Sequence, residues 1–131
     1  MTTATETTTP TLAAAAIELQ PGERYAGPIL DADGNIKHHL VLLPNRPENR
    51  LNWANAMEWA TSVGGHLPDR QEQALLYANC KPHLKPTWHW SSEKHEDDAS
   101  YAWGCYFLGG DQLGDGQSFE GSAVAVRRFV S

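Results

Sequence analysis

The sequence predicts an α+β domain in which two helices pack on small antiparallel sheets and a long loop region occupies the second half. The order of segments carries this prediction: two strand-like segments, two adjacent helix-like segments, then strand-like segments separated by polar loops. The size supports it, because 131 residues with 40 % hydrophobic content suffice for one core and not for two.

The amino-acid composition of the chain changes at Pro21. Residues 1–20 are rich in Thr and Ala and hold few large apolar side chains. Such a segment cannot offset its own ordering entropy, so we expect a flexible tail that orders only in an assembly. We therefore predict that the folded domain spans residues 21–131.

The first half of this domain predicts a hairpin followed by two helices. Residues 23–30 and 36–43 read as strands, because a turn signal at Asp33-Gly34 lies between two apolar runs. The spacing of Trp53, Ala56 and Ala60 predicts a helix over 52–63, capped by Asn52.

The second helix is predicted over 69–80. Asp69 and Glu72 stand three residues apart, as the two members of a capping box do, and Pro82 limits the far end. Gly64-Gly65 ends the preceding helix, so the connection between the two helices is short.

The second half predicts short strands separated by loops. Residues 88–92, 101–108 and 123–130 read as strands. Residues 93–100 form a charged loop, and residues 109–121, rich in Gly, Asp and Gln, form a long one. We interpret Trp90-Ser91-Ser92-Glu93 as structural, with Trp90 buried in the core.

Composition excludes several classes of function. The net charge of −6 argues against nucleic acid as the partner, since phosphate binding needs a clustered cationic face. No apolar run approaches the roughly 20 residues of a membrane span, and no signal peptide is evident. We expect a protein of the cytoplasm of a bacterial host, or of a virion, with Cys80 and Cys105 unlinked.

Several short motifs together resemble the Lcl-C-terminal-like family over about residues 21–130. In chain order the motifs are Trp53 with Ala56 and Trp59-Ala60, Gly64-Gly65-His66-Leu67-Pro68, Glu72 with Leu75-Leu76-Tyr77-Ala78-Asn79, Trp90-Ser91-Ser92-Glu93, Ala102-Trp103, Phe107, Gly110 and Val126-Arg127-Arg128. The resemblance implies a C-type-lectin-like fold. It also implies a phage or prophage setting, because members are common in bacteria and bacteriophages.

This fold by itself implies neither sugar binding nor catalysis. Its relatives include phage receptor-binding proteins and the sulfatase-activating oxidases. The oxidase relatives use two reactive cysteines near the C-terminus, whereas Cys105 stands alone there. The Glu-Pro-Asn and Trp-Asn-Asp motifs of calcium-dependent sugar binding do not occur. We therefore predict no catalytic residue, no metal and no cofactor.

The predicted binding site is the loop-rich face made by residues 93–100 and 109–121. These loops lack an apolar period, so their side chains are free to contact a partner. Phe119 is either an exposed anchor among polar neighbours or a ring folded back onto the sheet. The predicted partner-binding residues are Glu96, Asp97, Asp98, Asp111, Gln112, Asp115, Gln117 and Phe119.

The sequence thus predicts a non-enzymatic module, encoded by a phage or prophage, that binds another protein. The partner is a viral structural protein or a host factor, so the module is a particle component or an inhibitor of a host defence complex. Homo-oligomerisation is left open. The alternatives are a calcium- or carbohydrate-binding receptor-binding protein, suggested by the acidic loop, and an oxidase-like enzyme, suggested by the family's relatives.

Overall fold

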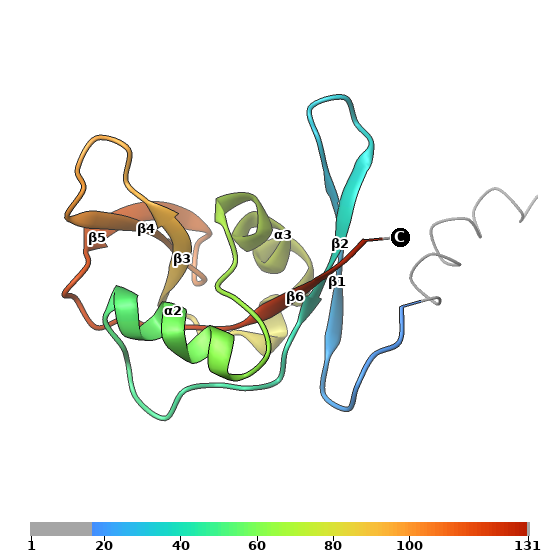
Figure 1. Ribbon diagram of the computed structural model, residues 1–131, viewed down its shortest axis with the longest axis horizontal. Coiled ribbons are helices and arrows are strands. Elements are labelled where there is room, and N and C mark those ends of the chain that lie inside the picture. The colour runs from blue at the N-terminus through green and yellow to red at the C-terminus, as the bar shows by residue number, and fades with distance from the viewer. Residues whose placement is uncertain (1–16, 131) are drawn as a thin grey trace, which may run out of the picture.

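The computed structural model describes residues 17–130, which form two small antiparallel sheets and two α-helices, an α+β arrangement (Figure 1). The first sheet has the order β1-β2-β6 and consists of Arg24–Leu30, Ile36–Leu42 and Val126–Phe129. The second has the order β3-β4-β5 and consists of Trp88–Lys94, Tyr101–Tyr106 and Asp111–Gly116. The helices are α2, Trp53–Ser62, and α3, Arg70–Cys80, which a 3-10 turn at Lys81–His83 follows.

Both helices begin at the residues that the sequence indicates. The Asn52 side chain accepts a hydrogen bond from the backbone N–H of Asn55 at 2.9 Å, which caps α2. At α3 both bonds of the capping box are present, between Asp69 and Glu72. The predicted hairpin is also confirmed, because β1 and β2 pair in antiparallel register.

The core fills the space between the sheets. In Figure 1, α3 lies between the two sheets. Its buried Leu76 belongs to a cluster that holds Leu40 of β2 and Phe107, just after β4. A second cluster joins Ala56 of α2 to Trp90 of β3, whose ring is fully buried and whose Nε1 donates to the Leu51 carbonyl at 2.7 Å. The structural interpretation of the Trp90 motif is confirmed.

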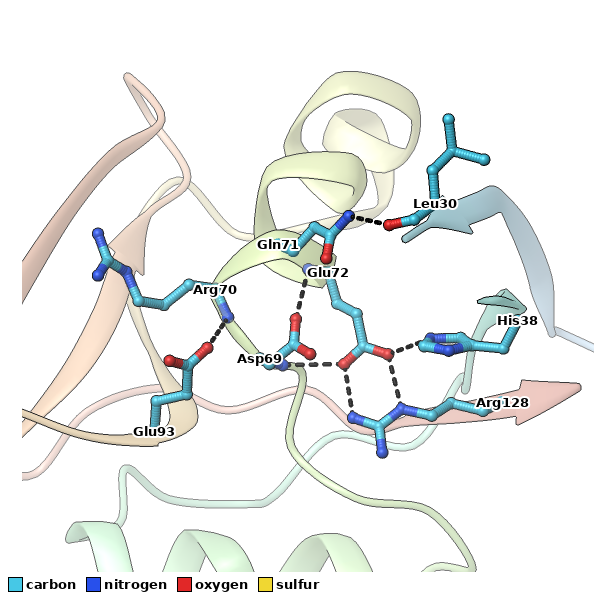
Figure 2. Close-up of polar contacts among 8 residues, drawn as sticks. All are labelled: Leu30, His38, Asp69, Arg70, Gln71, Glu72, Glu93 and Arg128. Atoms are coloured by element: carbon cyan, nitrogen blue, oxygen red, sulfur yellow. Dashed lines mark hydrogen bonds and ion pairs between the residues drawn. The ribbon is translucent and has the colours of Figure 1, made fainter. Parts of the chain in front are cut away.

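A buried carboxylate ties the first turn of α3 to the first sheet (Figure 2). Glu72 accepts bonds from Arg128 of β6 at 2.7 and 2.9 Å, and it bonds the Nε2 of His38 of β2 at 2.8 Å. Burial acts to raise the pKa of Glu72, but the hydrogen bonds and charge of Arg128 outweigh it and hold that pKa below its usual value. Glu72 therefore stays charged inside the protein at neutral pH.

Residues 121–126 run between the two sheets and bond to both halves of the molecule. Gly121 pairs with Leu51, and Ser122 bridges to His89 of β3. Further along, the Ala125 carbonyl accepts the N–H of Leu43 at 3.0 Å, and Val126 pairs with His66. This segment, called the strap below, connects β3 to the end of β2.

Several predicted boundaries in the second half are wrong, and β4 ends at Tyr106 rather than at residue 108. Residues 109–121 are not one loop, because Asp111–Gly116 forms β5 along the edge of β4. Glu93 and Lys94 belong to β3 and not to the charged loop, and the Glu93 carboxylate accepts the N–H of Arg70 at 2.8 Å (Figure 2). The last strand is shorter than predicted and begins at Val126.

The predicted tail, residues 1–20, lies mostly outside the described residues, and its ordering stays a prediction. Of its last residues, Ile17 is buried, and the Glu18 carbonyl accepts a hydrogen bond from Arg127 at 2.7 Å. Cys80 and Cys105 are both buried and both free, as predicted.

Candidate functional site

The loop that joins β3 to β4 carries three exposed carboxylates, on Glu96, Asp97 and Asp98. The loop is held by its own side chains: Asp98 accepts from the backbone N–H of Ser100 at 3.0 Å and from its hydroxyl at 2.7 Å. These bonds lower the pKa of Asp98. The three carboxylates thus face solvent on a turn that hydrogen bonds hold in place.

A stack of side chains supports this loop. The His95 ring stacks on Trp103 of β4 with centroids 4.7 Å apart, and the Arg70 guanidinium lies 3.7 Å from the Trp103 ring centroid. Arg70 also donates to the side chain of Gln112 at 3.0 Å, and Gln112 donates to the Arg70 carbonyl at 2.6 Å. Gln112 therefore joins β5 to α3, and its role in partner binding stays a prediction.

On β5, Asp111, Leu113 and Asp115 alternate and so share one face of the sheet. Opposite them on β4, Tyr106 pairs with Asp111, and Gly104 pairs with Leu113. Leu113 is 54 % exposed and Tyr106 is 38 % exposed. Leu113 thus lies between two carboxylates along β5, and Tyr106 lies diagonally across from it on the same sheet face.

The segment after β5 returns to the loop and then to β3. Gln117 donates to the carbonyls of Ala99 at 2.8 Å and Tyr101 at 3.2 Å, so its side chain fastens the loop to the rest of the chain. Phe119 meets the Trp88 ring edge-on, with centroids 5.6 Å apart, and remains 43 % exposed. Both interpretations of Phe119 hold in part, because its ring packs against Trp88 and is also partly exposed to solvent.

The eight predicted residues therefore separate into groups. Gln112 and Gln117 make internal bonds, and Phe119 packs on Trp88. The carboxylates lie along β5 and the adjacent loop, together with two apolar residues, Tyr106 and Leu113, that are not among the eight predicted residues. We call this set the β5 surface; it comprises Glu96, Asp97, Asp98, Tyr106, Asp111, Leu113 and Asp115.

One group in the loop has the composition of a metal site. Ligand atoms of His95, Glu96 and Asp97 all lie within 4.8 Å of one another. The Nδ1 of His95 already accepts the N–H of Asp97 at 3.2 Å, and calcium takes six to eight oxygen ligands, which two carboxylates do not supply. The loop is better explained as a solvated acidic turn.

The two thiols lack the features of reactive cysteines. Cys80 and Cys105 belong to one apolar cluster. Burial raises the pKa of both thiols, that of Cys105 to about 11, so thiolate is scarce at neutral pH.

A comparison with protein-family models finds no match, and neither does a search of curated proteins. Within residues 17–130, no helix combines the length and the apolar character needed to cross a membrane.

Proposed function

We propose that this chain is a non-enzymatic module that binds another protein through the β5 surface. The observation that carries the proposal is the exposure of Leu113 and Tyr106 beside each other on a sheet face rimmed by Asp111 and Asp115. Apolar anchors within a polar rim are typical of protein interfaces. The loop carboxylates extend the negative rim, so the complementary surface of the partner is basic.

We further propose a C-type-lectin-like fold of the Lcl-C-terminal-like type. The pairing of β6 with the N-terminal hairpin and the position of the helices beside both sheets support this assignment. The phage or prophage setting rests on the resemblance of the sequence motifs. In that setting the module is a particle component or an inhibitor of a host factor, and it acts in the bacterial cytoplasm or the virion.

The test compares two variants that change the net charge equally. Asp97→Lys with Asp98→Lys alters the β5 surface, whereas Asp33→Lys with Glu58→Lys alters the β1–β2 turn and α2. Each variant and the wild type are immobilised and exposed to a lysate of a bacterium that carries the gene, and bound proteins are quantified by mass spectrometry. We expect a basic protein that the wild type and the control retain, that the β5-surface variant loses, and that rising salt releases.

Two results would contradict the proposal. Equal retention by both double variants would move the interface away from the β5 surface. Loss of binding on removal of calcium, or competition by free sugars, would instead favour the calcium- or carbohydrate-binding alternative. Melting temperatures of both variants, measured alongside, separate lost contacts from lost folding.

A further inference from the structure

A cavity of about 330 Å³ lies between the segment that joins β2 to α2 and the start of β3. Residues 46–50 form one wall, Lys85 and Thr87 form another, and the strap residues Ser122 and Ala123 complete it. The cavity is separate from the loop carboxylates of the β5 surface, and its volume falls in the range of small-molecule sites.

A buried imidazole contributes to the lining. His89 is 2 % exposed, and its Nδ1 lies 2.9 Å from the Thr87 carbonyl, which can only accept. The ring is therefore the Nδ1–H tautomer, and Nε2 carries a lone pair. Among the described residues, Nε2 has no hydrogen-bond partner, yet the atom is not fully shielded from solvent. Because His89 lines the cavity, its Nε2 faces that space. A ligand there must offer His89 a hydrogen.

Two hydroxyls lie beside this acceptor. Thr87 Oγ1 and Ser122 Oγ are 3.0 Å apart and bond to each other, and both residues line the cavity. One hydrogen joins the two oxygens, which leaves one hydroxyl hydrogen and several lone pairs for a ligand. The pair suits a ligand that carries its own hydroxyl groups.

The mouth of the cavity is cationic. Arg50 and Lys85 are exposed, and neither forms an ion pair with a described residue. Arg46 adds a third positive charge while its guanidinium donates to three carbonyls, those of residues 43, 45 and 83. Glu48 is the carboxylate of the lining. The lining as described thus has an excess of two positive charges, in a protein whose overall charge is −6.

We propose that this cavity binds a hydroxylated organic anion of the sugar phosphate or sugar acid class. Arg50 and Lys85 hold the phosphate or carboxylate, while the His89 acceptor and the hydroxyl pair bind the ring hydroxyls. An adjoining notch of about 220 Å³, which Arg50 also lines, presents Tyr106 and Phe119 to the apolar face of the ring. The proposed site is additional to the protein-binding function, and the two share Tyr106 at the edge of the notch.

The proposal is tested by calorimetry, which measures the affinity of the full chain for each of four probes. Glucose 6-phosphate and glucuronate carry both an anion and hydroxyls, glucose carries hydroxyls alone, and inorganic phosphate carries the anion alone. We expect one or both of the first two to bind at least about tenfold more tightly than either of the last two, as a charge-assisted bond implies. The tighter of the two identifies the anionic group.

Matched variants and a spectroscopic measurement place the ligand in the cavity. Arg50→Gln should weaken binding about tenfold, whereas Arg24→Gln, an equal charge change on β1, should leave it unchanged. The ¹⁵N resonance of His89 Nε2 should shift with the bound probe, a readout that needs no substitution of a buried residue. Inorganic phosphate binding as tightly as the sugar anions, no binding by any probe, an unshifted Nε2, or equal affinity of both Arg variants would overturn the assignment.

Discussion

His89 lies in an environment that opposes its protonation. Burial lowers its pKa from 6.5 to about 4, and the positive charges of Arg46 and Lys85 act in the same direction. The side chain is therefore neutral in the folded protein over a range in which it would be protonated in the unfolded chain. This difference links the stability of the domain to pH.

The sign of that linkage follows from proton binding. Between pH 6.5 and about 4 the unfolded chain binds a proton at His89 that the folded chain does not, so stability falls as pH falls through this window. The loss amounts to roughly 3 kcal/mol. Urea unfolding at a series of pH values should show a shallower decline for His89→Gln than for the wild type.

The exposed His83 provides the control for this prediction. His83→Gln should reproduce the wild-type pH dependence, because this change leaves the buried His89 in place. A His89→Gln protein that loses stability as steeply as the wild type between pH 6.5 and 4 would show that His89 is protonated in the folded state.

At the scale of elements, structure that local hydrogen bonds determine was predictable from the sequence, whereas structure that depends on pairing with a distant strand was not. The starts of α2 and α3 were predicted because Asn52, Asp69 and Glu72 bond within three residues of themselves. β5 was missed because its sequence, Asp-Gln-Leu-Gly-Asp-Gly, has no strand propensity, and pairing with β4 determines its conformation.

The candidate surface was predictable to a similar extent. Charge and loop composition identified the carboxylates, which are exposed except for the half-buried Asp115. The internal role of Gln112 was not visible, because its partner Arg70 lies 42 residues away in sequence. The cavity at His89 brings together three distant segments and has no motif, so sequence alone gave no sign of it.

The attachment of α2 to β3 depends on the indole of Trp53, whose Nε1 donates to the Ser91 carbonyl at 2.9 Å. Trp53→Phe removes this bond and keeps an aromatic ring, so it should cost about 1 kcal/mol of unfolding free energy. Trp53→Ala also removes the ring and should cost about 3 kcal/mol. Chemical denaturation measures both values.

Trp90→Ala, at the fully buried ring that α2 covers, provides the comparison. It should cost at least as much as Trp53→Ala and should unfold the domain at moderate temperature. Melting of Trp53→Ala and Trp90→Ala at the wild-type temperature would contradict this account of the helix–sheet contact.

At the scale of the whole molecule, one buried cluster contains residues of both sheets. Cys80 at the end of α3 and Cys105 on β4 lie in the same buried cluster as β1 and β2 residues. Neither thiol is accessible unless this cluster opens. The two cysteines therefore report on the opening of the domain as a unit.

We expect both thiols to resist alkylation in the folded protein and to react together on unfolding. Mass spectrometry after a timed pulse of alkylating reagent at rising urea should show unmodified and doubly modified chains, with little singly modified product. Burial raises the pKa of Cys105 to about 11, which further slows its reaction in the folded state. Rapid labelling of one thiol without urea would indicate that the two sheets open separately.

The strap has a consequence for the folding of the chain during its synthesis on the ribosome. Residues 121–126 supply Ala123 and Ala125 to one cluster and Val124 and Val126 to the other, and they pair with Leu51 and His66. Among the described elements, only the remainder of β6 is synthesised after them. A nascent chain that ends before the strap exposes the inner sides of both clusters. Neither cluster can therefore be completed until these residues leave the exit tunnel, and the apolar surface of the earlier elements stays exposed up to that point.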